Sequence, residues 1–147
     1  MRLLHILLAE DNRADVLLIR AALREHRIEH ELQVVEDGAE AIEYVGRIGA
    51  DGGTACPDVV LLDLNLPKVE GPQVLEVLRK HPKCAGIPVI VVSSSEAMRD
   101  REEMARLGVS HYFRKPSDFD EFMKLGAVVR RVAEEAKLSG QEPAGSV

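Results

Sequence analysis

Hydrophobic and polar residues follow one another along this chain in blocks whose period changes at regular intervals. Five short runs are almost wholly aliphatic and give way abruptly to polar residues, which is typical of buried parallel strands. Between these runs lie longer segments with apolar residues three or four positions apart, the spacing of an amphipathic helix. The five predicted strands are residues 3–9, 32–35, 58–62, 88–92 and 110–114.

A helix is predicted after each strand. The first begins after Asn12 or Asp15, since either side-chain oxygen could accept from unpaired N–H groups of the first turn. The fourth ends at Gly108, a good C-cap, and the last starts near Ser117 or Asp118. The predicted helices are residues 14–25, 38–48, a segment carrying Val74, Leu75 and Leu78, residues 96–107, and a final segment with Phe122, Leu125, Val129 and Val132 facing inward.

This alternation predicts an α/β fold: a doubly wound, five-stranded parallel sheet with right-handed crossovers and helices on both faces. The length of 147 residues suits one domain. We expect the domain to span residues 1–138 and residues 139–147, Ser-Gly-Gln-Glu-Pro-Ala-Gly-Ser-Val, to form a flexible tail.

Composition narrows the function. The net charge of −6 argues against direct nucleic-acid binding, which usually needs a concentrated basic face. The apolar run at the N-terminus meets Glu10 and Asp11 too soon for a signal peptide or a membrane span, so we expect a cytoplasmic protein without a membrane partner. Cys56 and Cys84 lack metal-site spacing, and we expect two reduced thiols.

The residues with chemical potential follow the predicted strands. Glu10 and Asp11 come after the first strand, Asp63 after the third, Ser93 after the fourth and Lys115 after the fifth. The carboxyl ends of parallel strands share one edge of a sheet, where such folds bind their ligands. Crowded carboxylates repel one another unless a cation is present, and these oxygens suit Mg²⁺. A carboxylate beside Mg²⁺, with a lysine and a hydroxyl opposite, can accept a phosphoryl group.

Each of these features has a plainer interpretation when taken alone. Asp11 by itself would more often be a helix cap than a metal ligand, Lys115-Pro116 would be an ordinary loop, and the serines after the fourth strand an ordinary turn. Their order at successive strand ends favours a functional site.

Taken together, these residues resemble a known family. An acid pair, Asp63-Leu-Asn-Leu-Pro67, a hydroxyl residue after an apolar strand and a final Lys-Pro are similar to the receiver domains of bacterial response regulators. The resemblance covers roughly residues 3–138 and implies the flavodoxin-like (βα)5 fold of that family.

The resemblance also implies a role for each residue of the site. Asp63 would be the phosphorylated nucleophile. Mg²⁺ would be held by Asp11 and Asp63 directly, by Glu10 through water and by the backbone carbonyl of Asn65. Lys115 would pair with the phosphoryl oxygens.

Further roles concern switching. Ser93 would move toward the phosphoryl group, and Tyr112 would swing inward behind it. Asn65 and Ser95 occupy positions that tune the lifetime of the phosphoryl group, and the Lys115-Pro116 peptide would be cis.

Two departures are mild: Ser93 replaces the commoner Thr, and Glu10 stands where Asp is common. The excess length at residues 46–56 is similar to single-domain regulators that pair with bacterial phytochromes. The resemblance therefore implies a sensor histidine kinase as partner, of the phytochrome class. With no room for an output domain after residue 138, we expect signalling by conformational change and a homodimer through residues 96–107, 110–114 and the last helix.

Three alternatives differ in class. An aspartyl-phosphate phosphatase would need a second acid where Asn65 stands, so the protein is not expected to be an enzyme beyond catalysing its own phosphorylation and dephosphorylation. A nucleotide-binding domain would need a glycine-rich turn where Glu10-Asp11-Asn12-Arg13 stands. A receiver-like interaction module without phosphorylation is the remaining alternative, although such a module would be expected to have lost part of the site.

Overall fold

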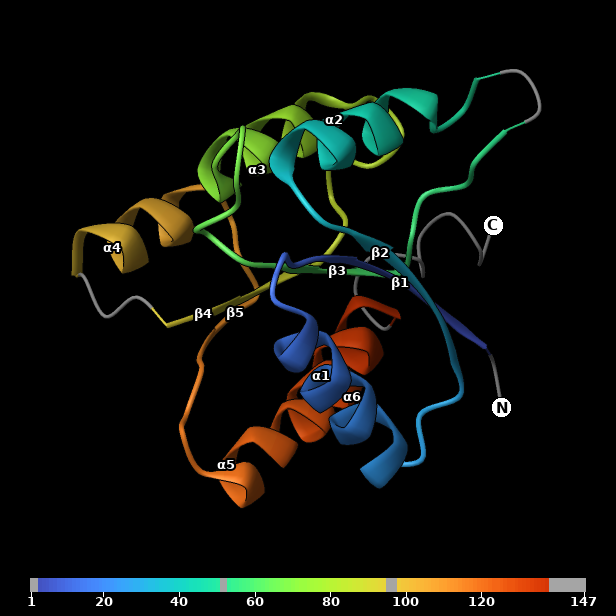
Figure 1. Ribbon diagram of the computed structural model, residues 1–147. Helices are drawn as coiled ribbons and strands as arrows, with labels where there is room; N and C mark the ends of the chain where they lie inside the picture. The colour runs from blue at the N-terminus through green and yellow to red at the C-terminus, as the bar shows by residue number, and fades with distance from the viewer. Residues whose placement is uncertain (1–2, 51–52, 95–97, 138–147) are drawn as a thin grey trace.

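The computed structural model describes residues 3–50, 53–94 and 98–137, and strands and helices alternate along them (Figure 1). Most bounds agree with the sequence prediction to within two residues; the predicted start of the fourth helix lies outside the described residues. The elements are β1 (Leu4–Ala9), α1 (Arg13–Glu25), β2 (His30–Val35), α2 (Gly38–Arg47), β3 (Val59–Leu62), α3 (Gly71–Lys80), β4 (Val89–Ser93), α4 (Met98–Arg106), β5 (His111–Arg114), α5 (Phe119–Met123) and α6 (Leu125–Ala136).

The strands form one parallel sheet in the order β2-β1-β3-β4-β5, which confirms the predicted fold class. The chain first moves from β1 out to β2 and then returns to place β3 on the other side of β1. The strand order therefore reverses between β1 and β3, where open α/β sheets bind their ligands. The register pairs Ala9 with both Val35 and Leu62, so the carboxyl ends of β1, β2 and β3 lie level.

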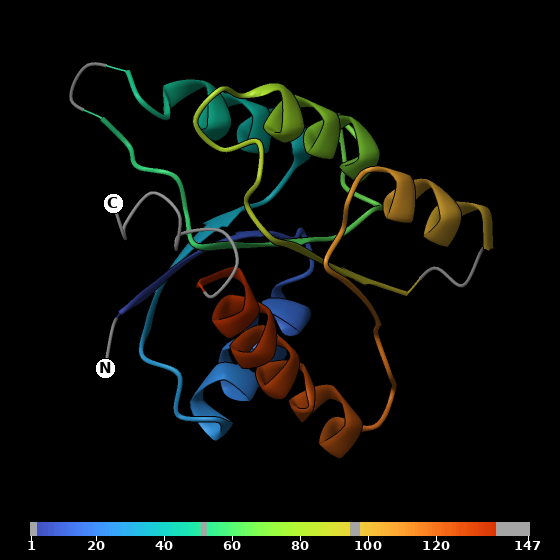
Figure 2. The same cartoon turned by 180° about the vertical axis from the view of Figure 1, so that it is seen from behind.

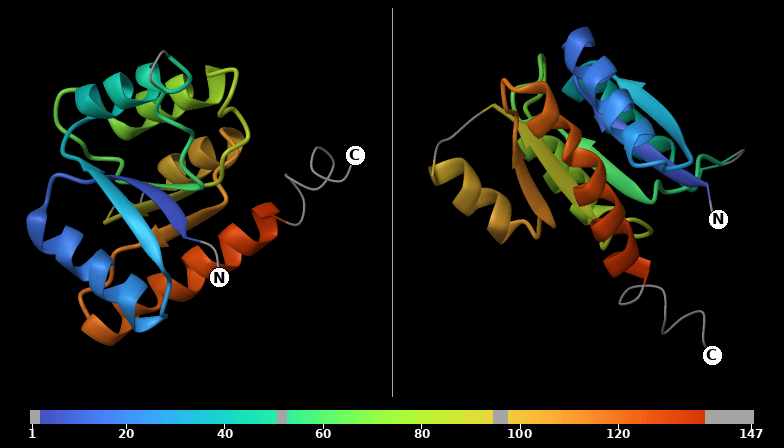
Figure 3. Two further views of the ribbon diagram at one scale, coloured as in Figure 1. Left: turned by 90° about the vertical axis from the view of Figure 1, so that its right-hand side faces the viewer. Right: turned by 90° about the horizontal axis from the view of Figure 1, so that it is seen from below.

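Helices cover both faces of the sheet. Helices α2, α3 and α4 lie on one face, and α1, α5 and α6 lie on the other, as Figure 1 shows and the view from behind in Figure 2 confirms. Viewed along the sheet and from below in Figure 3, α1 runs beside α6 under the strands. This three-layer arrangement buries both faces of the central strands, which explains why their sequences are continuously aliphatic.

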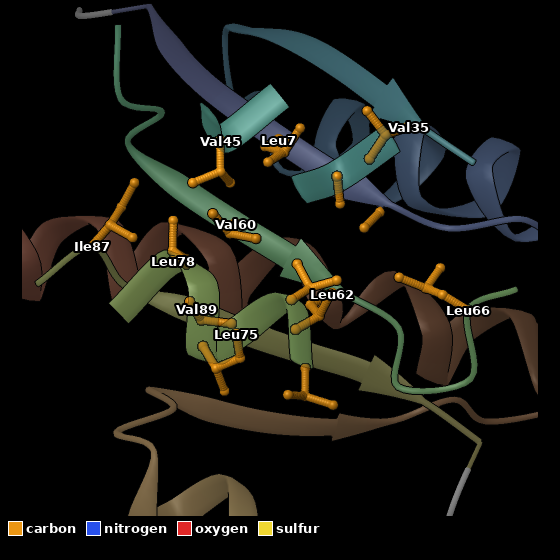
Figure 4. Close-up of a cluster of buried hydrophobic side chains, with 14 of the residues drawn as sticks. Leu7, Val35, Val45, Val60, Leu62, Leu66, Leu75, Leu78, Ile87 and Val89 are labelled. Atoms are coloured by element: carbon orange, nitrogen blue, oxygen red, sulfur yellow. The ribbon is translucent and has the colours of Figure 1, made fainter. Parts of the chain in front are cut away.

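Two hydrophobic clusters fill the spaces between the layers. Because side chains along a strand alternate between faces, Leu7 and Val60 enter the cluster under α2 and α3, whereas Leu8 and Leu61 enter the cluster over α1 and α6. Figure 4 shows the first cluster, with Leu75 of α3 directed at the sheet. The inward-facing residues predicted for the last helix, Phe122, Leu125, Val129 and Val132, are all buried in the second cluster.

Side chains fix where the helices begin. Asn12, one of the two residues predicted to cap α1, is the N-cap, and its Oδ1 accepts from the N–H of Asp15 at 3.0 Å. Asp118, one of the two predicted starts of the last helix, caps α5 by accepting from Glu121 N–H at 2.9 Å. Each cap satisfies a donor that lacks an intrahelical partner.

The predicted last helix is interrupted at Lys124, which separates α5 from α6. In a continuous helix the Met123 carbonyl would accept from Ala127 N–H. Here that carbonyl lies 3.0 Å from His26 Nε2 on α1, and Ala127 N–H donates to the Lys124 carbonyl instead. The contact between helices therefore provides a physical reason for the break, and nothing in the local sequence signalled it.

The expectation of two reduced thiols is wrong: Cys56 and Cys84 form a disulfide with their Cα atoms 5.9 Å apart. Cys56 lies shortly before β3 and Cys84 shortly before β4, and these two strands are neighbours, with Val60 opposite Val89. The pairing of the strands brings the two cysteines within the Cα separation that a disulfide requires. Sequence spacing alone does not reveal that proximity.

No helix within residues 3–50, 53–94 and 98–137 is long and apolar enough to cross a membrane.

Candidate phosphoryl-accepting site

Three acids meet at the carboxyl ends of β1 and β3. Carboxylate oxygens of Glu10, Asp11 and Asp63 all lie within 4.8 Å of one another, an arrangement that could hold a metal ion. Backbone bonds set this geometry: Glu10 N–H donates to the Val35 carbonyl at 3.0 Å, and Asp63 N–H donates to the Ala9 carbonyl at 3.1 Å. The sheet itself therefore brings together the acids that the sequence placed at successive strand ends.

Lys115 enters this group from the end of β5. Its Nζ donates to Asp63 Oδ2 at 3.0 Å and lies 2.9 Å from Glu10 Oε1. Its backbone N–H donates to the Ser93 carbonyl at 2.8 Å, which ties the segment after β5 to the end of β4. The lysine side chain is 13% exposed, so its ion pairs with the carboxylates are largely shielded from water.

The crowding of charges in this group shifts the pKa values of Glu10 and Lys115. Burial raises the pKa of Glu10 to about 7, and the negative charge of Asp63 adds to this effect against the opposing pull of Lys115. Burial alone would lower the pKa of Lys115, but its contacts with the surrounding carboxylates outweigh burial and raise it.

One oxygen of Glu10 has no hydrogen bond. Glu10 is 1% exposed, and its Oε2 accepts from Asn12 N–H at 3.1 Å. Oε1 lies near the Lys115 ammonium, but their relative geometry is not that of a hydrogen bond, and this oxygen has no hydrogen-bond partner among the described residues. A buried carboxylate oxygen of this kind is costly unless something further is bound there. The donor set therefore fits a hard divalent cation.

The loop after β3 packs closely behind Asp63. Asn65 N–H donates to Asp63 Oδ1 at 3.0 Å, and Gly71 N–H donates to the Leu64 carbonyl. A Cβ atom at Gly71 would lie 2.7 Å from both the Asp63 carbonyl oxygen and Leu64 Cα, so only glycine allows α3 to begin here. The structure thus places Asn65 beside Asp63, and the Asn65 side chain is exposed.

The two predicted switch residues lie on the neighbouring strands. Ser93 is fully buried at the end of β4, one strand from β3. Tyr112 is half-buried on β5, opposite Val91, and packs against the cluster beneath α4. The Arg101 guanidinium of α4 lies 4.8 Å from the centre of the Tyr112 ring, a cation–π contact that holds the ring at the surface beside α4.

Sequence reasoning missed Asp15 as part of this site. It appeared only as a possible helix cap, yet its Oδ2 accepts from Lys115 Nζ at 2.7 Å. Asp15 lies in the first turn of α1, four residues after Asp11 and therefore close to the end of β1. That spacing is the signal from which its place could have been inferred.

Two expectations derived from the family resemblance concern the Lys115–Pro116 peptide bond and Ser95. The Lys115–Pro116 peptide was expected to be cis, but it is trans, as no cis peptide occurs in the described segments. The trans isomer before proline is intrinsically favoured by about 0.5–1 kcal/mol. Ser95, expected to tune the phosphoryl lifetime, lies outside the described residues.

The profile of the response regulator receiver domain family matches residues 6–126. The match covers most of the chain, and the chain belongs to this family. The five-stranded parallel fold, the acids at the ends of β1 and β3, and the lysine after β5 are the features that the resemblance led us to expect.

One curated relative and one solved structure are similar to the chain over most of its length. Response regulator Rcp1 from Synechocystis is 34% identical over 120 residues, which is 82% of each chain. The crystal structure of the phosphorylated cyanobacterial phytochrome response regulator RcpA superposes with a TM-score of 0.79 at 36% identity, covering 94% of this chain and 96% of RcpA.

Two further solved structures of similar receiver domains hold a metal ion. The Mn²⁺-bound form of Rcp1 has a TM-score of 0.77 at 32% identity and covers 86% of this chain and 91% of its own. The other is the receiver domain of the sensor histidine kinase PA1611 from Pseudomonas aeruginosa, with magnesium in its active-site cleft. It has a TM-score of 0.71 at 26% identity, and the match covers 90% of this chain and 99% of the PA1611 domain.

Proposed function

We propose that this chain is a two-component signalling protein that accepts a phosphoryl group on Asp63 from the phosphohistidine of a sensor histidine kinase. One observation carries the proposal: the Asp63 carboxylate is shared between an acid cluster suited to a divalent cation and the partly buried Lys115 ammonium 3.0 Å away. A nucleophile in this position has positive charge available on two sides.

The reaction assigns a step to each residue. An Oδ atom of Asp63 forms the new P–O bond while the P–N bond of the phosphohistidine breaks, and the electron pair of that bond returns to the imidazole nitrogen. Lys115 offsets charge on the transferred phosphoryl oxygens, and the Ser93 hydroxyl donates to one of them. Bound Mg²⁺, held by Asp11, Asp63, Glu10 through water and the Asn65 carbonyl, would screen the repulsion between the two anions.

We propose that the protein also catalyses its own dephosphorylation at this site. Water would attack phosphorus and break the P–O bond to Asp63, which releases inorganic phosphate and restores the Asp63 carboxylate. We assign no other enzymatic activity to the chain.

Phosphorylation adds charge and strong acceptor oxygens beside Ser93 and Lys115. We infer that Ser93 moves toward them and that Tyr112 leaves its contact with Arg101 and turns inward, which remodels the face formed by α4, β5, α5 and α6. This face is our candidate for a homodimer. The likeness to the phytochrome response regulator RcpA makes a bacterial phytochrome our candidate for the kinase. The cytoplasm is our candidate for the location of the protein. We assign residues 1–138 to the receiver domain and residues 139–147 to a tail.

Intact-mass measurement after incubation with acetyl phosphate tests the proposed function. We expect one added phosphoryl group in the presence of Mg²⁺, and none without Mg²⁺ or in Asp63→Asn. Asp58→Asn is the matched control, because Asp58 directly precedes the first residue of β3, at the end of the strand away from the site. Its Oδ2 accepts from His5 N–H at 2.8 Å. Labelling should survive in this variant. A folded wild-type protein that takes no label would favour the interaction module that lacks phosphorylation.

A further inference from the structure

Asp15 occupies a place in the site that the acid cluster does not explain. Three carboxylates surround the Lys115 ammonium: Asp15 at 2.7 Å, Glu10 at 2.9 Å and Asp63 at 3.0 Å. Only Glu10 and Asp63 also belong to the cluster that could hold a metal ion. Asp15 contacts the lysine from the first turn of α1 and is separate from that cluster.

The position of Asp15 is fixed independently of Lys115. Its backbone N–H is bound by the Asn12 cap, so the residue starts from a rigid turn of helix. Its side chain is 20% exposed, which leaves the contact with Lys115 partly shielded from water. Lys115 is held in turn by its backbone N–H, which donates to the Ser93 carbonyl. The backbones of Asp15 and Lys115 are thus each fixed by hydrogen bonds of their own.

Charge accounting indicates which contact lasts through the reaction. A lysine ammonium has three protons and accepts none. Once a metal ion is bound, the charge of Glu10 is shared with it, and phosphoryl transfer converts the Asp63 carboxylate into an acyl phosphate. Asp15 is the one of the three partners that neither step alters.

We propose that Asp15 is a positioning residue that holds the Lys115 ammonium over Asp63 before and during phosphoryl transfer. This inference rests on the proposed function. Without Asp15, the lysine would keep its charge but lose its shortest contact, and its ammonium would spend less time directed at the incoming phosphoryl oxygens.

The first test measures the rate of phosphorylation by acetyl phosphate. We expect Asp15→Ala to slow labelling about tenfold, and Asp15→Asn to slow it less, because the amide oxygen still accepts a hydrogen bond. The Kd for Mg²⁺, measured by calorimetry, should stay within about twofold, because Asp15 is not part of the metal-binding cluster. Asp120→Ala is the matched control: Asp120 is an exposed aspartate in the first turn of α5, and labelling should proceed at the wild-type rate.

A double-mutant comparison separates positioning from a general effect on the helix. If Asp15 acts through Lys115, Asp15→Ala should cause no further slowing in a Lys115→Ala background. Equal slowing in both backgrounds, or a rate in Asp15→Ala equal to that in Asp120→Ala, would overturn the proposal.

A second readout needs no phosphorylation. In protein labelled with ¹⁵N-lysine, we expect the Lys115 ammonium protons to exchange slowly with water in the wild type and in Asp120→Ala, and at least several-fold faster in Asp15→Ala. Unchanged exchange in Asp15→Ala would overturn the positioning role. A wild-type protein that takes no phosphoryl group but has slowly exchanging Lys115 ammonium protons would instead contradict the proposed function. Its contact between Asp15 and Lys115 would then be only a structural ion pair.

Discussion

Lys115 carries one positive charge against three carboxylates that lie 2.7 to 3.0 Å from its ammonium nitrogen. With Asp11 nearby, the group has more negative than positive charge, and Glu10 bears most of the consequence because it is almost fully buried. The metal-free protein therefore keeps a proton on Glu10 at pH values at which an exposed glutamate would have lost it.

This proton makes stability depend on pH. The pKa of Glu10 is raised from 4.5 to about 7 in the folded protein, so between these values the folded state binds a proton that the unfolded state has released. The free energy of unfolding in EDTA should therefore fall as pH rises through this window, by roughly 1–3 kcal/mol from Glu10. Urea unfolding across the window would measure it.

Glu10→Gln should flatten this part of the pH dependence, because the amide does not titrate. Glu43→Gln, at an exposed position on α2, is the control and should keep the wild-type slope. If wild type and Glu10→Gln show the same slope, the raised pKa is not what governs acid stability here.

The sequence predicted Glu10, Asp11, Asp63 and Lys115 because the end of a parallel strand is a fixed place, so a residue's position along the chain gives its position in space. Asp15 lies on a helix, where the direction of a side chain depends on how α1 packs against the sheet. That packing is a tertiary property, and an aspartate near the start of a helix is equally suited to be a helix cap. Its contact with Lys115 was therefore out of reach of strand-end reasoning.

At the scale of elements, the start of α3 is the tightest constraint on the site. Gly71 begins this helix directly against the backbone of Asp63 and Leu64. Because the atoms that a Cβ would meet are backbone atoms, the strand or the helix would have to shift to make room. The shift would also move the loop that carries Asn65.

Gly71→Ala should lower the free energy of unfolding by about 1–3 kcal/mol and slow the labelling of Asp63. Gly46→Ala on α2 is the matched control, since a Cβ there meets nothing within 4 Å and alanine favours a helix. Urea unfolding and the labelling rate measure both effects. A Gly71→Ala protein as stable and as readily labelled as Gly46→Ala would show that the close contact does not constrain the site.

Elements were predicted well where their signal is local. The five strands follow from unbroken aliphatic runs, and the caps at Asn12 and Asp118 from side chains that accept hydrogen bonds nearby. The break at Lys124 and the Cys56–Cys84 disulfide depend on contacts between distant segments. Such contacts leave no periodic trace in the sequence, so the chain had to be folded before they could be seen.

At the scale of the whole molecule, the phosphoryl-accepting site and the face proposed for the homodimer lie on different parts of one sheet. The acids lie at the reversal between β1 and β3, whereas Tyr112 and Arg101 lie at the other side of β4. Arg131 of α6 is 3.1 Å from His111 on β5, so α4 and α6 each bring an arginine side chain to β5. A change at Ser93 is one strand away from this face.

We expect phosphorylation to shift the protein from monomer toward dimer through this face. Sedimentation velocity with Mg²⁺ and beryllofluoride, a phosphoryl analogue, should show the shift in wild type and not in Asp63→Asn. Arg131→Glu should weaken the dimer, while Arg24→Glu, at an exposed position on α1, should not. An identical distribution with and without the analogue would count against dimerisation as the output.

The most direct test of the account identifies the residue that carries the phosphoryl group. Borohydride reduces an aspartyl phosphate to homoserine, and mass spectrometry of peptides locates the product. After treatment with acetyl phosphate and Mg²⁺, we expect homoserine at position 63 and unmodified aspartate at positions 11 and 15. Homoserine at another aspartate of the site, or at none in a protein that gained phosphate, would contradict the assignment of Asp63 as the phosphoryl acceptor.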